Sequence, residues 1–538
     1  MRTTAGGNSG QHSFTNIPKA EIPRSSFDRS SNYKTTMNSG LLIPFFVDEM
    51  LPGDTINLKS TAFARMNTMI FPVMDNIYLN TFFFAVPLRL LWTNFKKFMG
   101  EQNNPADSVS YVTPKVNSAT GGFLANSMAD YFGIPTLATP GTVHTVCAFH
   151  FRAMNKIWNE WFRDENLQDS LPDNMGDGPD NIADYNLQRR GKRKDYFTSS
   201  LPWAQKGQPV TLPLGTTAPI KAYLTGGQPN ALIRNTATGA LATAAGTLNN
   251  TNAGVMTFSG PNNAYYDPNG SLYADLAQAT SATINALRTS VAVQRQLERE
   301  ARGGTRYTEL VRSCFGVTSP DSRLQRPEYL GGGQVDISVN PVPQTSGPTT
   351  GTTRPLAALG AFGTAIGATP HIVYSATEHC VLIGLASIRA DITYQTGENR
   401  MWQRDTKYDY YWPALSHLGE QPVYSREIYM DGTGTKPLGT GDWSTWGYQE
   451  RYGEYRYKPS IVTGQLRSNY PQTLDAWHLA LNFTARPTLG ATFIRDIPPI
   501  PRVVATQTEP EFLLDVYNRL RHVRPMPTYA VPGLMDHF

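Results

Sequence analysis

Apolar and polar side chains alternate along a stretch close to the N-terminus of the chain. From Ile56 to Ala64 every second residue is apolar or small, and the residues between them are polar except for Phe63. This period of two predicts a half-buried β-strand over 55–64. The Pro-Gly-Asp sequence at 52–54 predicts a turn before it, because proline fixes φ and glycine tolerates a positive φ.

Two further strands are predicted from similar patterns. Over 77–86 the residues are mostly β-branched or aromatic, and Pro87 ends the run. Over 477–484 every second residue from Trp477 to Phe483 is large and apolar. No stretch of the chain approaches the ~18 apolar residues that a membrane-spanning helix needs. The sequence therefore predicts several short strands and no membrane insertion.

Two stretches have the three- and four-residue spacing of an amphipathic helix. From Cys147 to Leu167 the apolar residues form a single stripe, which predicts a helix over 147–167 that packs against the strands. A second stripe predicts a helix over 281–302, and Gly303 and Gly304 supply its end.

The composition favours a loop-rich β protein over a helical one. The 538 residues include 45 glycines and 39 prolines, and only 17% are charged. Residues 1–40 contain few apolar side chains, so we expect an extended N-terminal arm there. Residues 205–283 are rich in Ala, Gly, Thr and Asn and nearly free of charge, which favours a surface insertion, with a low-complexity spacer as the alternative.

Several stretches of the chain have unusual and specific sequences. They are IPRSSFDRSSNYKTT at 22–36, FVDEMLPGDT at 46–55, HFRAMNKIWNEWFRDENLQ at 150–168 and RPMPTYAVPGLMDHF at 524–538. These stretches closely resemble the major capsid protein of the gokushoviruses, which are small single-stranded DNA phages of the Microviridae. The matching stretches lie over most of the chain outside about residues 205–283.

The resemblance implies a fold and an assembly. The fold would be mainly β, an eight-stranded antiparallel viral jelly roll with large helical and loop insertions. Residues 41–204 would form its first part and residues 284–538 the remainder with an extended C-terminal tail. Residues 205–283 would project near the three-fold axes and meet the host. The subunits would form a small icosahedral shell (T=1) around a circular single-stranded DNA genome.

A cluster of basic residues is the main candidate for contact with nucleic acid. Cations neutralise phosphates and aromatic rings stack on unpaired bases, and the cluster combines five cations with two rings: Arg189, Arg190, Lys192, Arg193, Lys194, Tyr196 and Phe197. The resemblance adds Arg24, Arg29 and Lys34 of the N-terminal arm. A net charge of +4 is too balanced to identify a nucleic-acid-binding protein by itself, and a solvated basic loop is the alternative.

Aromatic residues concentrate between 401 and 457, where they predict a subunit interface because Tyr and Trp bury area at little entropic cost. A sugar-binding platform is the alternative for the same rings. Arginines between 300 and 330 could bridge subunits or form salt bridges within one subunit. The interface candidates are Arg323, Arg326, Trp402, Trp412, Trp443 and Trp446.

The motifs that carry catalytic chemistry are absent from the sequence. There is no H-E-x-x-H, G-x-S-x-G or G-x-x-x-x-G-K-[ST], and the three cysteines are far apart. We therefore predict no enzyme activity, no metal site and no cofactor. The alternative function is a polysaccharide-binding or hydrolysing β-sandwich protein, for which carboxylate pairs such as Glu427 and Asp431 are available.

The N-terminus lacks the apolar core of a secretory signal, so we expect folding in the host cytoplasm and a final place in the virion. The resemblance implies several partners. These are further copies of the chain, the single-stranded DNA genome, a small basic DNA-binding protein, a pilot protein and a host surface receptor of unknown identity.

Overall fold

A computed structural model describes residues 23–108, 110–136, 142–208, 210, 284–304, 306–316, 325–345, 356–436 and 439–529, together with the backbone of short strands between 220 and 274. The chain divides into two compact units. The first unit consists of residues 1–204 and 303–538, and the second consists of residues 205–302. The second unit thus begins where the predicted insertion begins, and it continues beyond residue 283 to residue 302.

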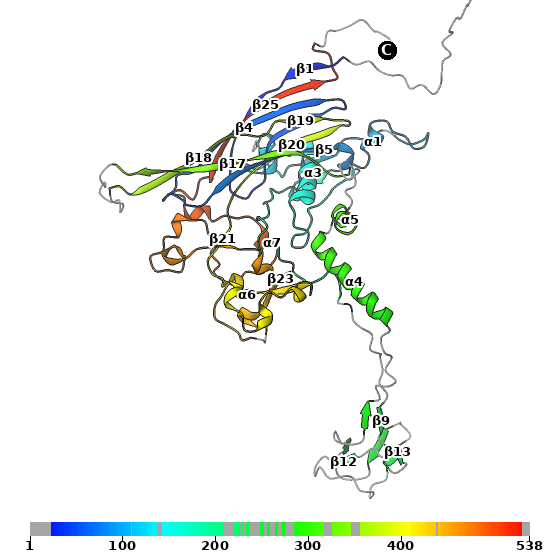
Figure 1. Ribbon diagram of the computed structural model, residues 1–538. Coiled ribbons are helices and arrows are strands. Elements are labelled where there is room, and N and C mark those ends of the chain that lie inside the picture. Colours follow the sequence, from blue (N-terminus) through cyan, green and yellow to red (C-terminus); the bar gives the residue numbers. More distant parts are fainter. Residues whose placement is uncertain are drawn as a thin grey trace, which may run out of the picture. The chain divides into compact units, whose positions relative to one another are not determined.

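One large antiparallel sheet organises the first unit (Figure 1). Along it the strands follow the order β1-β25-β4-β18-β17-β5-β20-β3, while β2 pairs with β25 and β19 pairs with β4. Its strands are β1 (Ser25–Asp28), β2 (Ser31–Met37), β3 (Ile43–Met50), β4 (Thr55–Met66), β5 (Ile77–Pro87), β17 (Glu328–Pro343), β18 (Leu359–Ala368), β19 (Ile372–Ser375), β20 (Cys380–Ala390) and β25 (Phe512–Arg524).

Side chains alternate along β4 between a buried face and an exposed face. Ile56, Leu58 and the other even-numbered residues are buried, whereas Phe63 is 44% exposed and so belongs to the outer face. Inward-facing residues of β5, β20 and β25 join them in one apolar cluster, because the two halves of the curled sheet enclose a common core. The mainly β jelly-roll fold and the strands predicted at 55–64 and 77–86 are confirmed.

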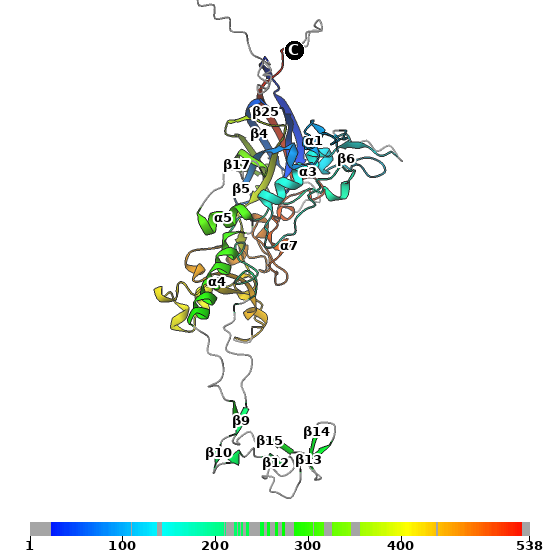
Figure 2. The ribbon, with the colours of Figure 1, turned by 90° about the vertical axis from the view of Figure 1, so that its right-hand side faces the viewer.

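A second apolar cluster lies on the outer face of β5 and β20. Helix α3 (Phe149–Ile157) contributes Phe151, Met154 and Ile157 to it, and Figure 2 shows α3 beside the strands. The helix predicted over 147–167 is therefore present but shorter. A π-helical turn, η2 (Trp158–Phe162), follows α3, and the backbone is extended at Arg163.

The strand predicted at 477–484 is wrong. Its backbone groups bond to side chains and to single backbone groups, such as the Thr393 carbonyl that accepts from the Leu481 amide at 2.9 Å, and form no strand ladder. The Leu479 amide donates to the Asp75 carboxylate, and the Arg502 guanidinium donates to the carbonyls of His478 and Ala480 at 2.6 and 3.2 Å. Alternation of apolar residues indicates an extended chain, but a ladder also needs a partner strand, and none pairs with this segment among the described residues.

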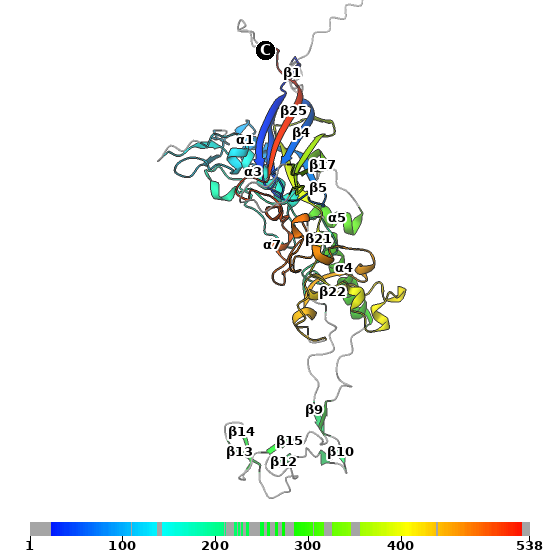
Figure 3. The same ribbon diagram turned by 90° about the vertical axis from the view of Figure 1, so that its left-hand side faces the viewer.

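Part of the predicted N-terminal arm belongs to the sheet of its own chain. β2 pairs with β25 from Ser31 opposite Asn518 to Met37 opposite Phe512, and β1 pairs with the last residues of β25. Figure 3 shows the C-terminal strand β25, in red, beside β1 and β4 in blue. Residues 1–22 of the predicted arm lie outside the described residues. So do residues 530–538, which form most of the predicted C-terminal tail.

Shorter elements complete the first unit. Its remaining strands are β6 (Lys115–Asn117), β7 (Thr145–Cys147), β8 (Asp180–Asn181), β21 (Thr393–Tyr394), β22 (Glu420–Tyr424), β23 (Thr445–Glu450) and β24 (Ser460–Ile461). Its remaining α-helices are α1 (Phe95–Phe98), α2 (Met128–Tyr131), α5 (Tyr307–Phe315), α6 (Ser425–Ile428) and α7 (Ala491–Ile494). Its 3-10 turns are η1 (Leu88–Leu90), η3 (Ile182–Asp184), η6 (Arg400–Trp402), η7 (Lys407–Asp409), η8 (Pro413–Leu415), η9 (Gly441–Trp443), η10 (Gly453–Tyr455), η11 (Gly464–Leu466), η12 (Asp475–Trp477) and η13 (Ile500–Arg502).

The second unit contains antiparallel two-stranded ladders and one long helix. Helix α4 (Ile284–Gly303) confirms the helix predicted over 281–302 and ends one residue after the predicted end, while residues 281–283 lie outside the described residues. Across the described part of the chain, no helix is long and apolar enough to cross a membrane. The strands of the unit are β9 (Ile220–Ala222), β10 (Leu224–Thr225), β11 (Gln228–Pro229), β12 (Ile233–Asn235), β13 (Leu248–Thr251), β14 (Val255–Phe258), β15 (Ala264–Tyr266) and β16 (Leu272–Ala274).

A buried ion pair ties α3 to strand β8, and its removal tests the packing of α3 against the sheet. Arg152 binds both carboxylate oxygens of Asp180 at 2.7 Å and donates to the Leu91 carbonyl at 2.9 Å. Asp180→Ala would leave the buried guanidinium without its counter-ion, so we expect a loss of about 3–5 kcal/mol in the free energy of unfolding, measured by urea titration. Asp515→Asn, which breaks the exposed pair with Lys34, should cost less than about 1 kcal/mol. Equal losses of unfolding free energy in the two variants would contradict the assignment of Arg152 and Asp180 as a buried, stabilising ion pair.

Candidate nucleic-acid interface

The basic segment 189–194 is held between two other parts of the chain. The Arg190 amide donates to the Gly40 carbonyl at 2.8 Å, on the side of β3. On the other side the Lys192 amide donates to the Ile494 carbonyl, and the Asp496 amide donates to the Arg190 carbonyl, both at 2.8 Å. The segment is therefore a structural link between the sheet and the region around α7, and not a free loop.

Each cation of the basic segment has an acceptor within the same chain. Arg193 and Lys194 keep partly exposed side chains, whereas Lys192 lies over the Phe493 ring at 4.3 Å. The partners are the Ser39 carbonyl for Arg189 (2.7 Å), Asn80 for Arg190 (3.0 Å), the Phe493 carbonyl for Lys192 (2.6 Å), Asp391 and Gln334 for Arg193 (3.3 and 3.2 Å), and Asp164 with the Thr198 carbonyl for Lys194.

Burial shifts the ionisation of the groups around this segment. It raises the pKa of the Asp496 carboxyl to about 6, although Lys192, Arg389 and Arg190 all pull that pKa downward. Burial also lowers the pKa of Lys192 to about 8 and that of Arg190 to about 10, and Arg389 and Arg193 lower the Arg190 pKa further. Positive charge is thus concentrated in a poorly solvated place.

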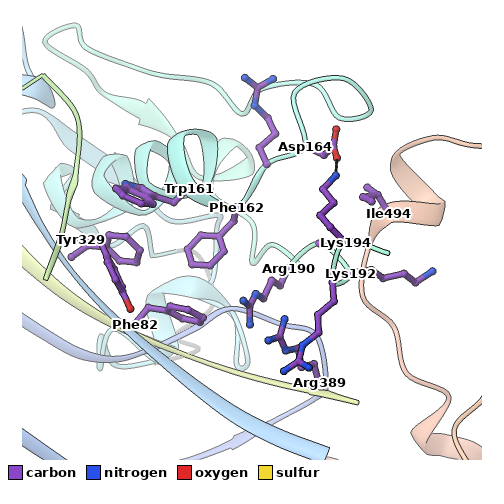
Figure 4. A pocket seen from close by; sticks show the side chains of 14 residues that line it. Phe82, Trp161, Phe162, Asp164, Arg190, Lys192, Lys194, Tyr329, Arg389 and Ile494 are labelled. Carbon is purple, nitrogen blue, oxygen red and sulfur yellow. Dashed lines mark hydrogen bonds and ion pairs between the residues drawn. The ribbon is translucent and has the colours of Figure 1, made fainter. Parts of the chain in front are cut away.

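The segment borders a cavity of about 480 Å³ (Figure 4). Aromatic rings from η2, β5 and β17 form one side of it, and cations form the other. Arg190 lies over the Phe82 ring at 4.7 Å. Such a lining can hold an anionic group beside a planar ring. The labelled lining residues are Phe82, Trp161, Phe162, Asp164, Arg190, Lys192, Lys194, Tyr329, Arg389 and Ile494.

Sequence reasoning missed Arg389 as a member of this site. Its Nε is buried without a hydrogen-bond partner among the described residues, and it lines the cavity from β20. Burial lowers the pKa of its guanidinium, and Arg193 lowers it further. The only signal in the sequence is the position of Arg389 on the polar face of a strand, which does not reveal that the basic segment lies opposite.

Tyr196 and Phe197 belong to the core and not to a base-stacking surface. They are only 3% and 4% exposed, within an apolar cluster that also contains Trp446 and Phe493. The Tyr196 hydroxyl donates to the buried Glu427 carboxylate at 2.8 Å. Because neither ring has a free face, we assign both to packing, which corrects the expectation that they stack on unpaired bases.

The three cations predicted in the N-terminal arm are all exposed but differ in their contacts. Arg24 donates to the Gly53 carbonyl and to Thr55, and Lys34 pairs with Asp515 on the outer face of β25. Arg29 donates to Asp48 at 2.6 Å and lies 3.1 Å from the Nδ1 of the buried His522. Of the three cations, only Arg29 contacts the buried His522 and its neighbour Asp48.

The predicted interface residues fall into two groups. Trp402 and Trp412 are 71% and 49% exposed, so their rings are available to a neighbouring subunit. Trp446 is only 8% exposed and donates to the Pro487 carbonyl at 2.8 Å, which places it in the core instead. Trp443 is half-buried beneath Arg426 and Lys436, and Arg326 lies over the Trp161 ring at 4.8 Å. Arg323 lies outside the described residues.

Within the described ranges, no group of three His, Cys, Asp or Glu side chains is arranged to hold a metal ion. Glu427, which the sequence offered as a glycosidase carboxylate, is buried and bound by Arg400 at 3.1 Å and by the Tyr424 amide at 2.9 Å. Burial raises its pKa. The contacts of Glu427 are those of a structural carboxylate.

The Asp496 carboxyl predicts a measurable pH dependence of stability. Its pKa is about 6 in the folded chain against 3.8 for an ordinary Asp, so between about pH 4 and 6 the folded state binds more protons than the unfolded state. Stability should therefore fall as the pH rises through this window. Asp496→Asn removes that slope, which urea titrations of both proteins at pH 4, 5 and 6 would measure. An unchanged slope in the variant would place the pKa of Asp496 near its ordinary value.

Comparison with known proteins identifies the family. The family model described as "Capsid protein (F protein)" matches residues 15–534. The chain is 45% identical over 545 residues to the capsid protein VP1 of Bdellovibrio phage phiMH2K, covering 99% of each chain. It is 42% identical to the capsid protein VP1 of Chlamydia phage 1 and 34% identical to that of Spiroplasma virus 4, covering 97% of each chain in both cases. The predicted gokushovirus resemblance is confirmed, and the chain belongs to the F-protein family of Microviridae capsid proteins.

Proposed function

We propose that this capsid protein forms a T=1 icosahedral shell that encloses a circular single-stranded DNA genome. The observation that carries the proposal is the family match, which extends over residues 15–534 and so includes both compact units. A capsid protein acts by binding further copies of itself, and it is a structural component of the virion. Assembly in the host cytoplasm belongs to the proposal.

Exposed aromatic residues between η6 and η10 support a role in subunit contacts. In addition to Trp402 and Trp412, several tyrosines of this region present their rings to solvent: Tyr408, Tyr410, Tyr411 and Tyr455. A concentration of exposed rings on a single chain indicates a binding surface, because an isolated soluble protein gains nothing from leaving them in water. We assign this surface to a neighbouring copy in the shell.

Arg404 and Lys407 pack against rings of this aromatic surface. Arg404 lies over the rings of Tyr410 and Tyr455 at 4.8 and 4.5 Å, and Lys407 lies over the Tyr408 ring at 5.0 Å. The Trp412 indole donates to the Lys407 carbonyl at 2.7 Å. Rings that are already ordered lose less entropy when a second subunit binds, which favours a tight contact.

For the genome we propose contact with the cations predicted from the sequence whose side chains remain exposed. In the arm these are Arg24, Arg29 and Lys34, and in the basic segment they are Arg193 and Lys194. Arg189, Arg190 and Lys192 are partly buried and would contribute positive potential from within the chain.

The second unit is the proposed contact with the host. Residues 205–283 carry few charges and many small polar residues, as expected for a projecting insertion. We further propose that the assembled shell works with a small basic DNA-binding protein, a pilot protein and a host surface receptor.

Removing two exposed indoles tests the assembly surface. Trp402→Ser together with Trp412→Ser should leave the chain folded, because both rings are largely exposed, but should remove roughly 2 kcal/mol or more from each contact that uses them. Closed shells, counted by electron microscopy and sedimentation velocity, should therefore fall at least about tenfold.

The matched control keeps a ring at both positions, as Trp402→Phe with Trp412→Phe, and should retain most of the assembly. Undiminished shells in the serine variant would remove this surface from the interface. If the unaltered chain stays a monomer and binds a glycan instead, the shell proposal itself fails and the sugar-binding alternative takes its place.

A further inference from the structure

The outer face of strands β4 and β25 carries cations that the rest of the structure does not use. The two strands pair antiparallel from Thr55 opposite Val523 to Met66 opposite Phe512. Their inward side chains enter the common core, so the alternate side chains point outward. Outward and exposed are Lys59, Arg65, Arg519 and Arg521, with Asn57 and Thr61 between them.

Like charges lie directly opposite one another on this face. Arg519 is the cross-strand partner of Lys59, and Arg521 follows two residues along the same face of β25. Cross-strand pairs of like charge destabilise a sheet. Water and salt screen this repulsion at an exposed site, and an anion that binds between the two cations relieves it further, so the arrangement is suited to an anionic ligand.

The acidic groups on this face only partly offset these cations. Asp515 pairs with Lys34. Asp28 lies opposite Arg521 and takes hydrogen bonds from Ser30, and Arg521 and Arg519 attract its carboxylate and help to lower its pKa without forming an ion pair. Among the described residues, none of the four cations forms an ion pair or a side-chain hydrogen bond. The face therefore carries a net positive charge that is open to solvent.

Two aromatic rings lie among the cations. Tyr517 faces Thr61 across the ladder, and Phe63 is the next outward residue along β4, so the two rings are diagonal neighbours. They are 48% and 44% exposed. Diagonal neighbours on a sheet are about 7–8 Å apart, which is close enough for aromatic side chains to form one surface.

We propose that this face binds single-stranded DNA, with phosphates on Lys59, Arg65, Arg519 and Arg521 and unpaired bases stacked on Phe63 and Tyr517. The inference rests on the proposed function and identifies the surface through which the subunit contacts its genome. A sheet that presents rings and cations on one face is suited to unpaired bases, whose flat faces a duplex would hide.

The charge of the face argues against a second copy of the chain as its occupant. A two-fold contact would bring Lys59, Arg519 and Arg521 of one copy against the same cations of the other. Such a contact buries like charges without partners and costs free energy. A polyanion has the opposite requirement, since each phosphate gains a cation and releases counter-ions.

This surface and the cavity beside the basic segment lie on opposite sides of the common core. Inward residues of β4, β25, β5 and β20 all belong to that core, whereas the cavity is lined by outward residues of β5 and β20. Lys34 of the N-terminal arm pairs with Asp515 on the same outer face as Lys59. DNA binding by the sheet face predicts that neutralising Lys59, Arg519 and Arg521 weakens the binding, whereas DNA binding beside the basic segment predicts that neutralising Arg193 and Lys194 does. One experiment can separate these two expectations.

Three charge neutralisations on the sheet face test the proposal. The purified full-length chain is titrated against a fluorescent 30-residue oligo-dT and against a duplex of equal length, over a range of salt concentrations. Each phosphate contact on a single strand contributes about 0.7 to the slope of log K against log salt. The variant that carries Lys59→Gln, Arg519→Gln and Arg521→Gln should therefore flatten this slope by about 2. The same variant should release DNA from purified particles at lower salt.

The aromatic part is tested separately. Phe63→Ala and Tyr517→Ala should each weaken oligo-dT binding at least about fivefold without changing the salt slope, because stacking contributes without charge. Tyr517→Phe, which keeps the ring, should retain affinity. Duplex binding should respond to the charge variant but not to the ring variants.

Matched variants make the result interpretable. One control removes three exposed cations elsewhere: Arg288→Gln, Lys458→Gln and Arg467→Gln. It should leave the slope unchanged. A charge-preserving variant with Lys59→Arg, Arg519→Lys and Arg521→Lys should bind as the unaltered chain does, which separates loss of charge from loss of folding.

The outcomes distinguish this inference from the proposed function. If the unaltered chain forms no DNA-filled shells, the proposed function fails. If it does form them and the sheet-face variant keeps the slope and DNA retention of the unaltered chain, only the inference fails. It is also overturned if Arg193→Gln with Lys194→Gln flattens the slope while the sheet-face variant does not. A change in shell assembly with unchanged DNA affinity would assign the face to a neighbouring copy, again against the proposal.

Discussion

The ladder between β4 and β25 is the interaction on which the rest of the structure depends. It joins a strand near the N-terminus to the last strand of the chain along all twelve residues of β4, and β1 and β2 extend the same sheet from the other edge of β25. This pairing sets β25 beside β4, so that inward residues of both strands share the apolar core with those of β5 and β20. Contacts so distant in sequence form late in folding, after local strands and turns have reduced the cost of loop closure.

The fold uses positive charge in two different ways. Around the basic segment, guanidinium and ammonium groups bind backbone carbonyls, amide side chains and partly exposed carboxylates, so they hold the sheet, η2 and the region of α7 together. On the outer face of β4 and β25 the cations have no such partners among the described residues. A charge that is satisfied internally contributes to stability and potential, whereas an unsatisfied one is available to a ligand.

Aromatic residues divide in the same manner. Tyr196 and Phe197 pack in one apolar cluster with Trp446 of β23, while Trp402 and Trp412 remain exposed to solvent. The family match gives this division a reason: a capsid subunit needs both a core of its own and a surface that only a neighbouring copy covers. The same kinds of aromatic side chain serve in the core and on the surface, and only their position in the fold distinguishes the two roles.

The sequence by itself determined the strands at 55–64 and 77–86 and the position of a helix near 147–167, because periodicity and turn chemistry are local properties. Membership of the capsid family also followed from the sequence, through the similarity of its specific stretches to known capsid proteins. Tertiary structure decided the rest. The segment at 477–484 has the right alternation, but side chains of Asp75 and Arg502 take the bonds that a strand would use. Alternation likewise assigns Lys59 and Arg519 to the polar sides of their strands. That the two cations face each other follows only from the pairing of β4 with β25, which no local pattern encodes.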